Sequence, residues 1–305
     1  MKGLPAETDF IVIGAGIAGL RAAIELAAAG RVLVLAKKEL PHSNTPAQPA
    51  GTARLSDEDG ITMHLQDTLT AGYGLCHPAA VKKLVDEGPE RIEELLAWAA
   101  QLERHNSRLL FSPEAAHSHS RVLHAQGEST VSEILRTLLA KTRSLKNISC
   151  AESAFVTNLN FEDGRVTGVS LLDAKGVPQE ILCSAVLLAT GGLGQIYRHT
   201  TNLESATGDG IALALRAGAE VSDLEFVQFH PTALYLKKAP RFPLGEDLRA
   251  EGAHLRNIEL NRFMAKFHPM GELAPPDVMT RAIIHEMEVS RAKDPFAASR
   301  CVRSR

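Results

Sequence analysis

The chain has 305 residues, enough for one large domain or two ordinary ones. Its 45% hydrophobic and 23% charged residues are typical of a globular protein, and a net charge of −3 gives no electrostatic reason to expect nucleic acid or an anionic membrane as a partner. The four cysteines are widely spaced without a Cys-x-x-Cys pair, which argues against a disulfide framework or a zinc site. The first apolar run, from Phe10, is soon interrupted by charged residues. We therefore expect a cytoplasmic protein without a membrane segment or a bound metal.

A strand, a glycine-rich turn and a helix open the chain. Residues 10–13 form an apolar run that predicts a strand buried on both faces. Residues 20–29 then predict a helix that Gly30 ends, and residues 32–35 a second parallel strand. Between first strand and helix, Gly-x-Gly-x-x-Gly allows a tight turn, close approach of backbone to a pyrophosphate and close packing of helix on strand. Its glycines are Gly14, Gly16 and Gly19. This pattern predicts a dinucleotide site.

The end of the second strand leaves the choice of dinucleotide open. Dinucleotide-binding folds often place an acidic residue there, on the adenosine ribose. In this chain Ala36, Lys37 and Lys38 occupy the position. A basic residue at this point is compatible with a 2′-phosphate and hence with NADP, so the choice has to come from the rest of the chain.

The next part of the chain predicts a long loop and three helices. Residues 39–60 are rich in Pro, Gly, Ser and Thr and predict a loop beside the glycine-rich turn. Helical spacing of apolar residues predicts helices over residues 61–69, 78–101 and 129–140.

Residues 111–127 are a polar stretch with three histidines and an arginine. Two interpretations fit it equally well. The stretch either lines a ligand cleft, where Glu114, His117 and Arg121 offer contacts to anions and amines, or it is a solvated loop. No carboxylate or cysteine completes an obvious metal-binding set with its histidines.

Three strand-like runs follow at residues 154–161, 166–172 and 180–188. Turn residues between them favour an antiparallel meander. The last run is fully apolar and breaks into Ala-Thr-Gly-Gly at residues 189–192, where small residues allow backbone to approach a cofactor. A βαβ unit, a meander and then this strand indicate an α/β protein.

This order resembles the FAD enzymes with a two-dinucleotide-binding layout, and four further segments narrow the resemblance. The four segments are similar to those of the succinate dehydrogenase, fumarate reductase and L-aspartate oxidase family of flavoproteins. The resemblance to this family extends from about residue 8 to about residue 288. Residues 114–125, with His-Ser-His and Leu-His-Ala, are similar to the L-aspartate oxidase branch in particular. The four segments are Ser-Ala-Thr-Gly-Asp-Gly at 205–210, Leu-Glu-Phe-Val-Gln-Phe-His-Pro-Thr at 224–232, Leu-Arg-Ala-Glu-Gly-Ala at 248–253 and Thr-Arg-Ala-Ile at 280–283.

The resemblance implies FAD as the cofactor. Some relatives attach it covalently through a histidine in the loop before Ala47 and Gln48, but here Ser43 stands at that position, which implies non-covalent FAD. Lys37 stands where this family commonly has a lysine, so the indication of NADP weakens. The residues that the resemblance assigns to FAD are Gly14, Ala15, Gly16, Ala18, Gly19, Lys37, Ser43, Gln48, Gly51, Ala189, Thr190, Gly191, Gly192 and Asp209.

The resemblance also implies the reaction. It is the oxidation of L-aspartate to iminosuccinate, the first step of de novo NAD biosynthesis, with hydride transfer to flavin N5. Fumarate would be an alternative acceptor and quinolinate synthase a partner. His230 and Thr232 would hold a substrate carboxylate, and Glu114 would face the substrate ammonium. For His230 and Glu114 the plainer alternatives are a core histidine and a solvated side chain.

Arg281 matches the proton-shuttling arginine of the family, with Glu246 and Glu251 near the site. Because arginine is protonated in essentially all proteins, it can act as a base only if carboxylates relay the proton. The plainer alternative for Arg281 is an ordinary ion pair with Asp277 or Glu286.

Three departures from the family pattern are visible. Pro49 and Ala50 replace two glycines of the flavin loop, where proline removes an N–H donor and alanine restricts φ. Two further glycines become Ala115 and Ala116, and Pro276 replaces an arginine. The family continues beyond the length of this chain, and we expect its return to the FAD domain and its helical domain to be absent.

We expect an FAD-binding domain with a βαβ core and a meander over residues 1–222 and an incomplete α+β capping domain over 223–290. The basic residues 291–305 would form an atypical tail, unlike the family. Two alternatives to an active L-aspartate oxidase stay open. One is a catalytically defective remnant and the other is an oxidoreductase of the fumarate reductase or succinate dehydrogenase type.

Overall fold

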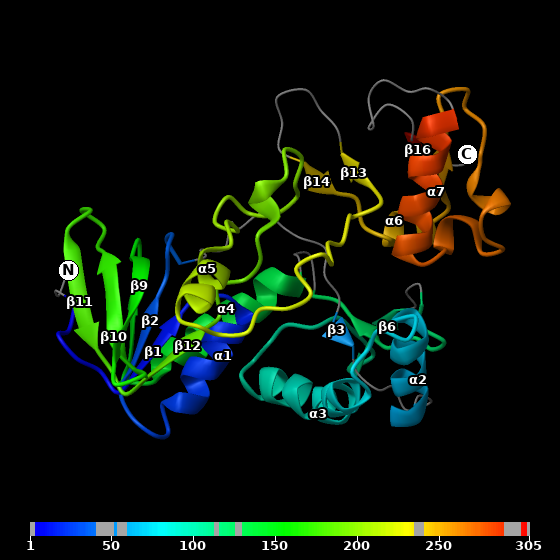
Figure 1. Cartoon of the computed structure of the whole chain (residues 1–305). Coiled ribbons are helices and arrows are strands. Elements are labelled where there is room, and N and C mark those ends of the chain that lie inside the picture. The colour runs from blue at the N-terminus through cyan, green and yellow to red at the C-terminus, as the bar shows by residue number, and fades with distance from the viewer. Residues whose placement is uncertain are drawn as a thin grey trace. The chain divides into compact units, whose positions relative to one another are not determined.

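The computed structural model describes residues 4–40, 52–53, 60–112, 116–125, 130–234, 241–289 and 300–303. The chain divides into two compact units. Figure 1 colours the chain by residue number, from blue at the N-terminus to red at the C-terminus. The first unit comprises Met1–Pro46, Trp98–Ala100 and Ser132–Glu225, and the second comprises Ala47–Ala97, Gln101–Val131 and Phe226–Arg305. Residues 47–97 and 101–131 thus group with the C-terminal part, and the consecutive domain boundaries that we expected stay a prediction.

A parallel sheet forms the centre of the first unit. Its strands are β1 (Phe10–Ile13), β2 (Val32–Leu35), β8 (Ile148–Ala151) and β12 (Ala185–Leu188), in the order β12-β1-β2-β8. Helix α1 (Ile17–Leu26) connects β1 to β2, so the βαβ unit that the sequence predicted is confirmed. Strand β8 was not predicted, because Ile148–Ala151 is short and only partly buried.

Gly30 follows α1 for a different reason from the one that we predicted. The helix ends at Leu26 with Ala27 as its C-cap, so Gly30 is not the C′ residue. Its φ lies outside the left-handed region. A Cβ at Gly30 would lie 2.9 Å from Asp9 Cβ, so close packing explains the glycine.

The second sheet of this unit is the antiparallel meander of β9 (Phe155–Glu162), β10 (Arg165–Leu172) and β11 (Pro178–Leu182). The single strand that we predicted over residues 180–188 is wrong, because the run is divided between β11 and β12. At the break, Cys183 N donates to Thr167 O within β10, and Ser184 N donates to Asp9 O, one residue before β1. The chain therefore leaves the meander and enters the parallel sheet within two residues.

The core of the unit follows from the alternation of side chains along β1 and β2. Ile11, Ile13, Leu33 and Leu35 lie on one face and pack with buried residues of the meander. Val12, Val32 and Val34 lie on the other face, with Ala23 of α1 among their neighbours. The meander and α1 thus cover opposite faces of the sheet, which confirms the α/β class. Helices α4 (Thr130–Ser144) and α5 (Asp209–Arg216) and a 3₁₀ turn at Gly194–Ile196 complete the description of this part of the chain.

The second unit is built from smaller elements. Helices α2 (Ile61–Ala71) and α3 (Pro78–Ala97) lie in it, together with a small sheet of β3 (Thr52–Ala53), β7 (Val122–Leu123) and β6 (Phe111–Ser112) and the hairpin of β4 (Arg104–His105) and β5 (Arg108–Leu109). Ile92, Leu102 and Leu123 form a common buried cluster. This cluster joins α3 to the small sheet.

The C-terminal part of this unit has its own core around α7 (Pro276–Val289). Strands β13 (Ala233–Leu234) and β14 (Phe242–Pro243), helix α6 (Asp247–Ala250), strand β15 (Ala253–Arg256) and two 3₁₀ turns, Met264–Lys266 and Gly271–Leu273, precede it. Leu255, Phe263, Met264, Met279 and Ala282 are buried together. Strand β16 (Arg300–Arg303) pairs with β15, so part of the expected atypical tail has regular structure. Among the described residues, no helix has the length and apolar character needed to cross a bilayer.

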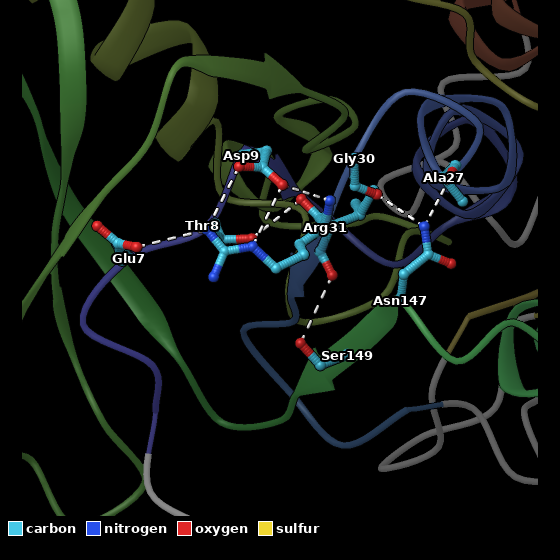
Figure 2. A network of polar contacts seen from close by, with 9 residues as sticks. Glu7, Thr8, Asp9, Ala27, Gly30, Arg31, Asn147 and Ser149 are labelled. Carbon is cyan, nitrogen blue, oxygen red and sulfur yellow. Dashed lines mark hydrogen bonds and ion pairs between the residues drawn. The ribbon is translucent and has the colours of Figure 1, made fainter.

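A polar network lies around the start of β2 (Figure 2). The Asp9 carboxylate accepts hydrogen bonds from the Arg31 backbone N at 2.6 Å and from its Nε at 3.2 Å. Asn147 Nδ2 donates to Ala27 O at 2.5 Å and to Gly30 O at 2.7 Å. Asn147 thereby satisfies carbonyls that the end of α1 leaves without helical partners.

We expect Asn147→Ala to lower the free energy of unfolding by about 1–2 kcal/mol, because two backbone carbonyls lose their donor. Urea unfolding of the purified protein measures this. Asn158→Ala, on an exposed position of β9, is the matched control and should stay within about 0.5 kcal/mol of wild type. Equal stability of the two variants would contradict the assignment of Asn147.

Candidate functional site

Three parallel strands of the first unit end at the same level. Ile13 of β1 is in register with Leu188 of β12 and with Leu35 of β2. The segments that follow, 14–19, 36–38 and 189–192, therefore lie at one edge of the sheet. The carboxyl edge of a parallel sheet is the usual ligand side of such folds. The residues of these segments that we assigned to a dinucleotide therefore lie at this edge.

Two of the three glycines in the turn are required by the fold. Gly14 has φ +114°, and a Cβ there would lie 2.2 Å from Ala189 O. A Cβ at Gly19 would lie 1.9 Å from Gly14 O. Both positions exclude any side chain, since strand, turn and helix are in direct contact.

Gly16 differs from these two glycines. Its backbone is extended, with φ −78° and ψ −174°, and no atom lies within 4 Å of the position of a Cβ. Gly16 is also the N-cap of α1, without a side-chain cap, and the first turn of α1 contains no acidic residue. Open space beside uncapped helix N–H groups suits an anion such as a pyrophosphate.

Helix α5 is packed against the turn after β12. A Cβ at Gly210 would lie 1.8 Å from Thr190 Oγ1, so helix and turn touch. Gly208 takes a left-handed φ of +78° and donates its N–H to Gly192 O at 3.2 Å. These contacts place Asp209, the first residue of α5, beside the sheet edge.

The Lys37 side chain links the end of β2 to the start of α5. Its Nζ lies 2.6 Å from Asp209 Oδ2 and 2.6 Å from Thr207 Oγ1, and 5.4 Å from the centroid of the Phe155 ring. Burial alone would raise the pKa of Asp209, but the hydrogen bonds from Lys37 and Thr207 and the Lys37 charge hold this pKa below its ordinary value. The Lys37 charge is balanced within the chain, which favours FAD over a 2′-phosphate ligand. Helix α5 and the strands of this edge belong to the same unit and are labelled in Figure 1.

Several expected contacts lie outside the described residues. These are Ser43, Gln48 and Gly51 for FAD, Glu114 for the substrate, and the substitutions at Pro49, Ala50 and Ala115. Their predicted roles stay predictions.

The second unit brings His230, Thr232 and Glu246 together. His230 Nδ1 lies 2.6 Å from Thr232 O, and Thr232 Oγ1 donates to Leu244 O at 2.9 Å. Burial and then the positive charge of Arg249 lower the pKa of His230, while its hydrogen bond and Glu246 oppose this. The neutral form of His230 is therefore favoured.

Arg249 is the residue of this cluster that we did not include among the predicted site residues. Its side chain is buried, its Nη1 donates to Thr232 Oγ1 at 3.0 Å, and its Nε donates to Glu272 O at 3.1 Å. Its Nη2 lies 3.8 Å from Glu246 Oε2. The signal in the sequence is the spacing of three between Glu246 and Arg249, which puts both on one face of a helical turn.

The other predicted residues of this unit lie at exposed positions. Arg281 is 66% exposed and its Nη2 lies 2.6 Å from Asp277 Oδ2, one helical turn earlier. This is the ordinary ion pair that we named as the alternative. Glu251 is exposed as well. Pro276, which replaces an arginine of the family, opens α7, where its missing N–H has no cost.

Arg121 does not have the role of a direct ligand contact that we considered. Its side chain is fully buried, and its Nη1 lies 2.6 Å from Asp67 Oδ2 and 2.9 Å from His117 Nδ1. Burial alone would raise the pKa of Asp67, but hydrogen bonds from Ser118 and Arg121 lower it from 3.8 to about 2. The described part of the chain contains no group of three His, Cys, Asp or Glu side chains that could hold a metal ion.

Comparison with known proteins agrees with the assignment of the sheet edge to a dinucleotide. The family described as FAD binding domain matches residues 9–301, which includes most of the segment 291–305 that we expected to differ from the family. L-aspartate oxidase from Synechocystis is 42% identical over 296 residues, covering 96% of this chain and 53% of the relative. L-aspartate oxidase from Streptomyces coelicolor is 41% identical over 310 residues, covering 98% and 53%. The chain spans about half the length of these curated relatives.

Solved structures show the same fold. A variant of Escherichia coli quinol fumarate reductase superposes with a TM-score of 0.87 at 28% identity, over 96% of this chain and 52% of that chain. Mycobacterium smegmatis Sdh1 superposes with a TM-score of 0.80 at 31% identity, over 96% and 52%.

The glycines of the turn give a differential prediction. Gly14→Ala should lower the free energy of unfolding by about 2–4 kcal/mol, since overpacking and strain each cost about 1–3 kcal/mol. Gly16→Ala should stay within about 0.5 kcal/mol of wild type, because its Cβ meets open space. It should nevertheless weaken FAD binding at least about tenfold, equal to about 1.4 kcal/mol, by filling the space of the pyrophosphate.

Urea unfolding and flavin retention measure the two effects. Gly88→Ala, where a Cβ also meets open space, is the control and should retain FAD. Normal flavin retention in Gly16→Ala would contradict the proposed path of the dinucleotide.

The Asp67 pair predicts a pH dependence. Because the folded pKa of Asp67 lies below the unfolded one, its ionised form stabilises the fold above about pH 4, and this stabilisation is lost as the pH falls toward 2. Asp67→Asn should therefore be less stable than wild type at pH 7, with a difference that shrinks between about pH 4 and pH 2. Unfolding curves across this range test it, and a constant difference would contradict it.

Proposed function

Because this chain belongs to the FAD-binding family whose match covers residues 9–301, we propose that it serves the FAD-dependent oxidation of L-aspartate to iminosuccinate, the first step of de novo NAD biosynthesis. The observation that carries this proposal is the identity of about two fifths with L-aspartate oxidases over nearly the whole chain. The preserved dinucleotide edge and the cluster at His230 support it.

FAD is the cofactor of this family, and the residues at the sheet edge fit it. Gly16 and the N-terminus of α1 would hold the pyrophosphate, and Lys37, residues 189–192 and Asp209 would lie along the rest of the molecule. When bound, FAD supplies a two-electron acceptor for the hydride that leaves the substrate Cα. The flavin loop with Pro49 and Ala50 is the segment whose departure from the family bears most directly on affinity.

His230 and Thr232 would bind a substrate carboxylate. His230 Nδ1 donates to Thr232 O, so a carboxylate at Nε2 requires a proton on that nitrogen. Binding of the substrate carboxylate is then coupled to proton uptake by His230. The charge of buried Arg249 favours an anion nearby.

Arg281 would move the proton that the substrate amine loses, together with Glu246 and Glu251. In this role Arg281 has to exchange its ion pair with Asp277 for contact with the reacting group, and carboxylates have to relay the proton. The assignment follows from the match of the Thr-Arg-Ala-Ile segment to the family.

A fumarate reductase type of activity is the second candidate, because the superposition on E. coli quinol fumarate reductase has a TM-score of 0.87. The proposal of L-aspartate oxidation also includes fumarate as an alternative electron acceptor, a cytoplasmic location and quinolinate synthase as a partner. A remnant without turnover is the third candidate.

An absorption spectrum of the purified chain and an assay of aspartate-dependent hydrogen peroxide separate these candidates. The proposal expects a flavin spectrum and aspartate-dependent peroxide. Absence of flavin after reconstitution with FAD would support the remnant, and fumarate reduction without aspartate oxidation would support the second candidate.

Glu114 distinguishes the two substrates. Glu114→Gln should lower kcat/KM for L-aspartate by about 10- to 100-fold, equal to about 1.4–2.7 kcal/mol, because the ammonium loses its carboxylate. Fumarate has no ammonium, so its reduction should change less than about threefold. Glu90→Gln, which alters an exposed carboxylate on α3, is the control. Equal losses with both substrates would contradict the role of Glu114.

A further inference from the structure

A threonine of helix α7 is hydrogen-bonded to the segment that contains His230. Thr280 Oγ1 donates to Phe229 O at 3.1 Å and to Pro276 O at 2.9 Å. A hydroxyl has one proton, so the two carbonyls share it or receive it in turn. Pro276 lies one helical turn before Thr280, whereas Phe229 lies 51 positions away in the chain. The bond to Phe229 therefore ties α7, drawn in orange to red in Figure 1, to this segment.

The buried face of α7 determines where Thr280 lies. Met279, Ala282 and Ile283 are buried in the C-terminal core, and the Arg281 side chain is 66% exposed. Because a helix turns by about 100° per residue, Thr280 lies between the buried and the exposed face, where it is partly buried. The hydroxyl thus meets a backbone carbonyl of another segment at the border of this core.

The residue two positions after His230 is held by buried contacts. Thr232 is buried, its Oγ1 donates to Leu244 O at 2.9 Å, and the same oxygen accepts a hydrogen bond from Arg249 Nη1 at 3.0 Å. His230 Nδ1 lies 2.6 Å from Thr232 O, which orients the imidazole ring relative to Thr232. The position of the His230 backbone also depends on the peptide group that precedes it. Phe229 O, the acceptor for Thr280, belongs to that peptide group.

We propose that Thr280 is a positioning residue for carboxylate binding, which holds the peptide group between Phe229 and His230 so that His230 Nε2 meets a substrate carboxylate. The inference rests on the proposed function, in which His230 binds that carboxylate. Thr280 does not touch the substrate in this role. The peptide group is planar, so a hydrogen bond to Phe229 O also fixes the orientation of the His230 N–H. Without this bond a smaller fraction of the free protein holds His230 in the binding orientation, and the apparent affinity falls by that fraction.

Succinate and L-aspartate are the probes, because both carry two carboxylates. Calorimetric titration of the 305-residue chain loaded with FAD gives the dissociation constant of each. Thr280→Val keeps the shape of the side chain and removes the hydroxyl. It should weaken the binding of both ligands by about three- to tenfold, the range that corresponds to one lost hydrogen bond, at unchanged flavin content. Thr280→Ser keeps the hydroxyl and should stay within about twofold of wild type.

Thr68→Val on α2 is the matched control. Thr68 Oγ1 donates to His64 O at 2.9 Å, one helical turn earlier, which is the kind of bond that Thr280 also makes with Pro276. The control removes such a bond within a helix and leaves the contact with Phe229 in place. It should change neither dissociation constant.

A double-mutant cycle with His230 separates positioning from mere structure. If Thr280 acts through His230, Thr280→Val in a His230→Ala background should not weaken succinate binding further. Additive losses, an unchanged affinity of Thr280→Val for succinate, or a loss in Thr280→Ser as large as that in Thr280→Val would each overturn the inference.

Thr280→Ala provides a second variant in case Thr280→Val does not fold, since it also removes the hydroxyl and has a higher helix propensity. It should show the same loss of affinity for both ligands. A wild-type chain that binds both ligands but does not oxidise L-aspartate would contradict the proposed function alone. A wild-type chain that binds neither ligand would contradict the inference as well.

Discussion

Three parallel strands that end level with one another are the constraint on which the dinucleotide edge depends. The registers of β1 with β2 and of β1 with β12 bring Gly14 within direct contact of Ala189, where even a methyl group would overlap with the backbone. The close contact in turn sets the start of α1 and leaves space at Gly16. Position and chemistry are thus linked, because the same packing that excludes side chains at two glycines provides open helix N–H groups at the third.

Charged side chains have different roles in the two units. Lys37 and Asp209 are each about one third exposed, so their ion pair adds little to stability by itself and serves to place Asp209. Arg121 and Arg249 are buried, and each is held by hydrogen bonds from its guanidinium to acceptors on other elements. The local structure around such a buried arginine depends on a few contacts, because an unpaired buried charge is costly. The contacts of Arg249 lie next to the proposed substrate residues His230 and Thr232.

Membership of the FAD-binding family and the geometry of the sheet edge agree on the cofactor, whereas the proposed reaction is assigned to residues of the second unit. The first unit contains the described part of the dinucleotide edge, and the second contains His230, Thr232, Glu246 and Arg281. Residues 43, 48–51 and 114 lie outside the described part of the chain. The proposed oxidation of L-aspartate therefore rests on similarity to relatives about twice as long, together with the local geometry within each unit.

The sequence alone determined the βαβ unit, the meander and the family, because these depend on local patterns: apolar runs of strand length, glycines at fixed spacing, and short motifs in a fixed order. Tertiary structure decided what local patterns do not contain. It divided the run 180–188 between two sheets, since β11 pairs with its neighbour β10 whereas β12 pairs with β1, which is distant in the sequence. It assigned Gly30 to close packing against Asp9 and showed that Arg121 is a buried anchor. In each case the deciding contact joins residues more than 20 positions apart, which no local pattern reports.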